Sequence, residues 1–117
     1  MEYERYGKLI VPDTLVNRPY GWVASNPNIT MLKINEKDLF LLIDADVLYD
    51  INDALDLLIG LCEEEEIPYD KLDIAIKITE ESLLKEKDSE TRRVINDYLL
   101  KMLYLAKEKK TLLALYL

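Results

Sequence analysis

The apolar residues of this chain occur only in short runs, and this pattern limits the folds open to it. The longest run, Leu112–Leu117, has six residues, whereas a helix that crosses a membrane needs about 20. Half of the 117 residues are hydrophobic, which is enough for the core of one ordinary domain. We therefore expect a single domain over residues 1–117, with no contact to a membrane. The charged start, Met1–Tyr6, does not resemble a signal peptide and favours a cytoplasmic location.

The first 35 residues predict a β-rich segment. Lys8–Pro12 is a short apolar run that ends at a proline, and Ile29–Ile34 alternates imperfectly between apolar and polar residues, as a partly buried strand does. We expect turns at Asn17–Gly21 and Ser25–Asn28, because both segments contain residues that favour tight turns. Asn35–Asp38 predicts a hairpin loop that leads into the next apolar run.

Three further segments predict regular structure in the middle of the chain. Leu39–Ile43 predicts a strand buried on both faces, although a buried helical turn has the same pattern. Residues 50–66 predict a helix with Asp50 as its N-cap, ended by Pro68. Residues 72–78 place apolar side chains at every second position and predict a strand. A helix also fits this segment, because a second set of residues follows the helical period: Leu72, Ala75, Ile76, Thr79 and Leu83.

The last third of the chain predicts two helices and a final strand. Thr79 is expected to cap a short helix through Glu86, and Ser89 to cap a long helix that ends near Lys109. Leu112–Leu117 predicts a buried last strand, with a continued helix or a homodimer interface as alternatives. If the last three strands are parallel, right-handed crossovers place both main helices on one face of the sheet. The predicted fold class is therefore α+β: a β-rich N-terminal half followed by α-β-α-β, in a two-layer sandwich with two main helices packed on one sheet.

Two residue types limit the chemistry. The chain has no His and one cysteine, Cys62, so a disulfide within the chain, a cysteine-based zinc site and Ser-His-Asp catalysis are excluded. Cys62 lies in an apolar stretch and is expected to be a small buried side chain. The many charges and the absence of Gln are a tendency of thermophile proteins and favour an archaeal or archaeal-viral source.

The acidic residues are concentrated in one part of the chain. The net charge is −8, and residues 36–73 hold thirteen of the 23 acidic residues but only two basic ones, Lys37 and Lys71. Direct binding of nucleic acid depends on phosphate neutralisation by Lys and Arg, so we do not expect it. Two roles fit such an acidic segment. It can simply keep the protein soluble, or it can form a surface that attracts a basic partner. The residues predicted to bind such a partner are Asp53, Asp56, Glu63, Glu64 and Glu65.

A pair of carboxylates, Asp44 and Asp46, directly follows the apolar run at residues 39–43. Side chains two apart on a strand share a face, and Mg²⁺ or Mn²⁺ prefers oxygen ligands. The segment Leu41–Leu48 resembles the first strand of PIN-domain nucleases, the acidic strand of archaeal-eukaryotic primases and the second acidic motif of Toprim domains. Each resemblance implies a divalent-metal site at the two aspartates. A primase also needs a His-containing motif, which this chain lacks, and we assign no family.

A second short resemblance lies near the N-terminus. Tyr6–Leu15 resembles the opening of the swapped-hairpin antitoxins, which implies a DNA-binding protein. The basic residues that such proteins use on DNA are not evident in this chain.

The sequence therefore leads to three functional hypotheses. We favour a non-enzymatic interaction or regulatory protein, such as an archaeal viral inhibitor or accessory factor, that docks a basic, nucleic-acid-binding protein and needs no cofactor. The second hypothesis is a metal-dependent phosphoryl-transfer enzyme that uses Asp44 and Asp46 with Mg²⁺ or Mn²⁺. The third is a structural homo-oligomer assembled through Leu112–Leu117.

Overall fold

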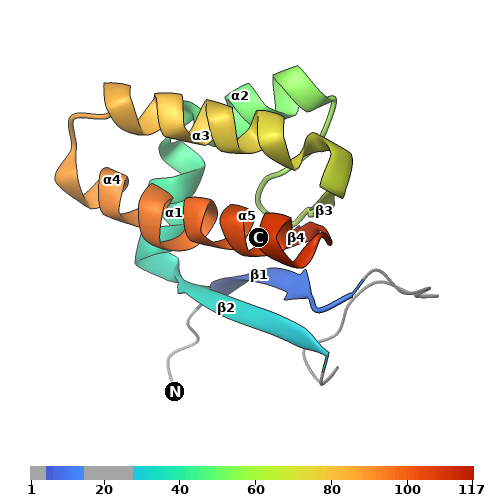
Figure 1. Ribbon diagram of the computed structural model, residues 1–117. Helices are drawn as coiled ribbons and strands as arrows, with labels where there is room; N and C mark the ends of the chain where they lie inside the picture. The colour runs from blue at the N-terminus through green and yellow to red at the C-terminus, as the bar shows by residue number, and fades with distance from the viewer. Residues whose placement is uncertain (1–4, 15–27) are drawn as a thin grey trace, which may run out of the picture.

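Four antiparallel strands form one sheet, and the helices gather on one side of it (Figure 1). The computed structural model describes residues 5–14 and 28–117. The predicted turn at 17–21, and all of the turn at 25–28 except Asn28, lie outside these residues. The elements follow in the order β1 (Tyr6–Pro12), β2 (Ile29–Asn35), α1 (Glu36–Asp44), α2 (Asp46–Leu55), β3 (Glu64–Ile67), the 3₁₀ turn η1 (Tyr69–Lys71), α3 (Leu72–Lys85), α4 (Ser89–Val94), the π-helical η2 (Ile95–Leu100), α5 (Lys101–Lys109) and β4 (Leu113–Tyr116).

The strand order in the sheet is β2-β1-β4-β3, so the two ends of the described chain meet in the middle of the sheet. All three strand pairs are antiparallel, and the parallel arrangement considered for the last strands is wrong. Leu9 pairs with Leu32 on one side and Leu115 on the other, and this face packs against the helices in the main core. The fold is α+β, with helices packed on one sheet, as the sequence predicts.

The apolar run at 39–43 is helical, so the predicted strand there and the hairpin loop at 35–38 are wrong. Asn35 is the N-cap of α1, because its side chain accepts a hydrogen bond from the Asp38 N–H at 2.9 Å. This bond satisfies one of the N–H groups that a helix leaves unpaired at its first turn. The buried leucines of the run lie one helical turn apart, on the side that faces the core: Leu39 and Leu42.

The predicted helix at 50–66 is wrong at both ends, because α2 begins and ends earlier. Asp56 follows α2 in a left-handed conformation, with φ of 57°. The side chain of Asn52 then holds the next loop, since it accepts a hydrogen bond from the Ile59 N–H and donates one to the Ile59 carbonyl. This loop leads into β3. Its four residues, Glu64–Ile67, were predicted to lie in the helix or at its end, but they form a strand that pairs with β4.

Cys62 lies in the loop between α2 and β3. It is exposed, so the expected burial is wrong. Its φ is 62°, in the left-handed region, and Arg5 donates a hydrogen bond to its sulfur at 3.4 Å.

Residues 72–78 form the first half of α3, so the predicted strand is wrong and the helical alternative is correct. A strand would bury Ile74, which is 49% exposed. The buried side chains follow the helical period instead: Leu72, Ala75, Ile76 and Thr79. Thr79 does not cap a new helix, because its hydroxyl donates to the Ala75 carbonyl within a helix that continues to Lys85.

The long helix predicted at 89–109 is present as α4, η2 and α5. Its N-cap is Asp88, one residue before the predicted Ser89, and the Asp88 carboxylate accepts hydrogen bonds from the N–H and the hydroxyl of Thr91. The helix ends at Lys110, which has a φ of 57°. The six residues of η2 form a π-helical segment in the middle.

The last strand predicted at Leu112–Leu117 is confirmed by β4. It lies between β1 and β3, and all residues of the segment are buried except the half-buried Tyr116. Thr111, just before it, is buried and donates a hydrogen bond to the Pro12 carbonyl. The alternative of a continued helix is therefore wrong, and the segment predicted as a homodimer interface forms the interior of the monomer.

Candidate functional site

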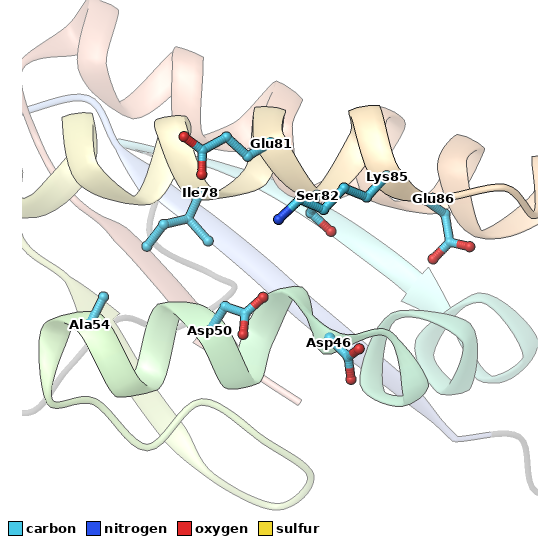
Figure 2. A pocket seen from close by; sticks show the side chains of 8 residues that line it. All are labelled: Asp46, Asp50, Ala54, Ile78, Glu81, Ser82, Lys85 and Glu86. Carbon is cyan, nitrogen blue, oxygen red and sulfur yellow. The ribbon is translucent and has the colours of Figure 1, made fainter.

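A groove lies between α2 and α3, and half of its lining residues are acidic (Figure 2). Its volume is about 620 Å³, and it is open to the surface along one side. Four of its eight lining residues are acidic, and Lys85 is the basic one. The lining residues are Asp46, Asp50 and Ala54 from α2, and Ile78, Glu81, Ser82, Lys85 and Glu86 from α3 and its C-cap.

The helical spacing of α2 puts its acidic residues along the groove. Asp46 is the first residue of α2, and Asp50 follows four positions later, so the two share one side of the helix. Asp53 lies three residues further on and extends this acidic stripe. Because the opposite side of α2 carries the buried Val47, Leu48, Ile51 and Leu55, the stripe is turned outward from the core.

α3 supplies the other wall of the groove. Ile78 points from α3 toward α2 (Figure 2), so the floor is partly apolar. Glu81 and Lys85 lie one helical turn apart on the same helix. Glu86 is the C-cap of α3, and its carboxylate accepts hydrogen bonds from the N–H groups of Lys87 and Asp88.

Three carboxylates of the groove are exposed and form no ion pair, although Lys85 lines the same groove. Within residues 5–14 and 28–117, no Lys or Arg lies within ion-pairing distance of Asp46, Asp50 or Glu81. Three basic residues of the C-terminal helix pair with carboxylates outside the groove: Arg93, Lys107 and Lys109. The arrangement can therefore hold cationic groups without first breaking an internal ion pair.

The five residues predicted to bind a partner lie on two separate elements. Asp53 and Asp56 are exposed on α2 and at its end, and Glu63 and Glu64 are exposed at the start of the edge strand β3. Glu65 is half-buried and serves the fold, because its carboxylate accepts hydrogen bonds from two backbone N–H groups, those of Leu58 and Glu66. None of the five lines the groove, although Asp53 belongs to the α2 stripe.

Asp44 and Asp46 do not lie on a strand. Asp44 ends α1 and Asp46 begins α2, and Ala45 between them is extended with φ of −74° and ψ of 147°. The shared strand face on which the predicted metal site depended is therefore not present. In the described part of the chain, no group of three or more Cys, Asp or Glu side chains is placed to hold a metal ion.

Among the described ion pairs, the one with the most buried carboxylate lies outside the groove, at Asp38 in the first turn of α1. Arg93 donates to its carboxylate at 2.8 Å, the Tyr98 hydroxyl donates at 2.8 Å, and Asn35 donates at 3.4 Å. The hydrogen bond from Arg93 is the main cause that holds the pKa of Asp38 below its usual value, and it outweighs burial, which acts in the opposite direction. Burial and the bond to Asp38 raise the pKa of Tyr98. These hydrogen bonds join α1 to the C-terminal helix. Because each polar group of the cluster already has a partner, the cluster is not a binding site.

Most of the groove was not predicted from the sequence. Asp46 was assigned to a metal and Asp50 to a helix cap, and no role was given to Glu81 or Lys85. The available signal was the spacing of Asp46, Asp50 and Asp53, which places them on one side of a helix. This signal becomes visible only when the helix is known to begin at Asp46.

Comparisons of the chain with protein-family models, with curated proteins and with solved structures find no match. Among the described helices, none is both long and apolar enough to cross a membrane. The function of the chain is therefore inferred from the geometry of the groove and the charges around it.

Proposed function

We propose that this chain is a non-enzymatic interaction protein that docks a basic protein through the acidic groove between α2 and α3. The partner would present Lys or Arg side chains, as the surface of a nucleic-acid-binding protein does. In this role the chain acts as a regulatory or accessory factor, by occupying a basic surface that other ligands use. The proposal includes a cytoplasmic location and requires no cofactor.

The observation that carries the proposal is the unpaired state of the groove carboxylates. Asp46, Asp50 and Glu81 come from two different helices and face one hollow, with no ion pair to a described Lys or Arg. Carboxylates that lie close together repel one another, and a cation between them relieves this repulsion. Binding of a basic side chain is therefore favourable without rearrangement of the described fold.

The apolar part of the groove suits long basic side chains. Ile78 and Ala54 line the hollow together with the carboxylates. Lys and Arg side chains bury their aliphatic stems against apolar surface while the charged end stays near water or a carboxylate. A basic partner can thus contact both parts of the groove at once.

The proposal is tested by calorimetric titration with a short arginine-only peptide. At about 0.1 M salt, where the Debye length is about 10 Å, we expect saturable binding of one peptide per chain. The double variant Asp50→Asn/Glu81→Gln should weaken binding about threefold to tenfold, because each lost ion pair at an exposed site contributes roughly 0.3–0.7 kcal/mol. Raising the salt to about 0.5 M should weaken binding of the wild type strongly.

The matched control is Asp97→Asn/Glu108→Gln, which changes the net charge by the same amount. Both residues are exposed on the C-terminal helix, and α3 lies between that helix and α2. The control should change the affinity by less than about twofold. Equal weakening in the two double variants would show that only net charge matters, and the groove would then not be the docking site.

The metal-dependent alternative keeps Asp44 and Asp46 as its ligands and Mg²⁺ or Mn²⁺ as its ion. It predicts that the Asp44→Asn/Asp46→Asn variant loses calorimetric Mn²⁺ binding that the wild type shows. The geometry of the described residues does not favour it, because the two aspartates lie on either side of a helix junction and no third ligand joins them.

A further inference from the structure

The residues that line the groove between α2 and α3 change in kind along its length. On α2, Ala54, Asp50 and Asp46 each lie one helical turn from the next. Figure 2 shows Ala54 and Ile78 toward one end of the groove, Asp46 and Glu86 toward the other, and Asp50 between them on α2. The α2 wall therefore presents one apolar position followed by two acidic positions along a single line.

The apolar end of the groove has surface that a ligand can reach. Ala54 is exposed on α2. Ile78 is half-buried, because it packs against the main core and also lines the groove. An aliphatic side chain placed between them removes apolar surface of both residues from water, which is favourable.

The other two positions of the α2 wall favour positive charge. Asp50 and Asp46 are exposed, and neither forms an ion pair with a Lys or Arg in the described part of the chain. A cation opposite each carboxylate is attracted without first breaking an existing pair. Charge complementarity thus fixes the acidic end of a ligand, and apolar contact fixes its other end.

We propose that the groove binds a basic amphipathic helix of the partner protein. Its aliphatic side chain contacts Ala54 and Ile78, and its Lys or Arg side chains lie opposite Asp50 and Asp46. A helix along the groove advances about 6 Å for every four residues, as α2 does, so its side chains stay level with the three positions. An extended segment advances about 6.7 Å for every two residues and falls out of step. Two neighbouring helices also form the kind of groove into which a third helix packs.

The bound helix rests on the proposed docking function, because it occupies the same groove. It adds a requirement that charge alone does not impose, which is the order of the side chains. A shift of the helix by one turn would place a cation at Ala54 and Ile78, or the aliphatic side chain at Asp50. The order therefore sets both the position and the direction of the partner helix.

The test uses three alanine-based helical peptides of equal charge in calorimetric titrations at about 0.1 M salt. The first peptide has a Leu, with an Arg one turn later and another Arg two turns later. The second has the same composition but places the Leu between the two arginines, and the third has Ala in place of Leu. We expect the first peptide to bind about fivefold more tightly than the third, because its Leu side chain leaves water. The second should bind no more tightly than the third.

The variant Ala54→Asp/Asp50→Ala keeps the composition and charge of the α2 wall and exchanges the order of its positions. Both residues are exposed, so the core is unchanged. This variant should prefer the second peptide to the first. A variant that still prefers the first peptide would overturn the proposed helix.

The peptides also separate the helix from the docking function on which it rests. If the third peptide binds and the first binds no more tightly, the proposed helix is wrong and the docking of a basic partner stands. If none of the three peptides binds, both are wrong.

Discussion

Arg93 and Asp38 form an ion pair across 55 positions of the chain, with a nitrogen–oxygen distance of 2.8 Å. The Asp38 side chain is only 6% exposed, so water cannot replace its partners. The pair fixes the start of α1 against α4, two elements that the sequence alone does not bring together. Since a buried carboxylate without partners is strongly unfavourable, the fold depends on this contact.

Replacement of Asp38 should therefore destabilise the protein. We expect Asp38→Asn to lower the free energy of unfolding by about 2 kcal/mol, because the variant loses the charge-assisted bond to Arg93 and places an amide N–H₂ group at a position where only donors meet it. Tyr98→Phe removes one bond from the same cluster and should cost about 1 kcal/mol. Urea unfolding followed by circular dichroism measures both values. A smaller loss in Asp38→Asn than in Tyr98→Phe would contradict the account.

The same cluster predicts how stability depends on pH. The pKa of Asp38 is lowered in the folded state, so its contribution is complete above the unfolded-state pKa of about 3.9 and is lost as the pH falls through the folded-state value. The difference in unfolding free energy between the wild type and Asp38→Asn should thus be constant near neutral pH and should shrink below about pH 4. A difference that stays constant down to complete acid unfolding would show that the Asp38 pKa is not lowered.

The cap of α1 gives a third prediction. Asn35→Ala should lower the free energy of unfolding by about 1 kcal/mol, because the Asp38 N–H loses its acceptor. Asn35→Ser should retain most of the stability, since Ser is also a good N-cap. Thermal unfolding of the three proteins measures the order. If Ser and Ala at this position were equally destabilising, Asn35 would not act as a cap.

The left-handed end of α5 gives a fourth prediction. Lys110 has a φ of 57°, a conformation that costs most residues energy but costs glycine none. Lys110→Gly should raise the melting temperature by a few degrees. Glu108→Gly, within α5, should lower it, because glycine weakens a helix interior. A lower melting temperature in Lys110→Gly would contradict the left-handed conformation of Lys110.

The sequence predicted the elements whose patterns have only one interpretation. β1, β2 and the long C-terminal helix were correct, because a run stopped by Pro12, a strand-like alternation and a helical spacing each favour one structure. β4 was also correct, although its apolar run left a continued helix open. The apolar run at 39–43 was assigned to a strand, since five apolar residues do not distinguish a buried strand from a helical turn. The helix at 36–44 depends on the Asn35 cap and on packing against the sheet. The packing involves residues far apart in the chain, so it leaves no pattern within the run itself.

The candidate site was predicted only as a region of charge. The acidic segment was recognised, but the helix start was placed at Asp50 and not at Asp46, so the stripe along α2 was not seen. The strand assigned to 72–78 removed the second wall of the groove, because Ile78 and Glu81 then belonged to different elements. Chain segments that meet only in the folded state, as α2 and α3 do, leave no local pattern.

The docking proposal is tested most directly by mapping the arginine peptide on the protein with amide NMR shifts at low salt. We expect the largest shift changes at Asp46, Asp50 and Glu81, with smaller ones at Asp53, and we expect all of them to be lost in Asp50→Asn/Glu81→Gln. The acidic pair Asp70 and Asp73, which lies outside the groove, should change little. Changes that follow acidic residues over the whole surface, or that persist in the double variant, would contradict a docking site in the groove.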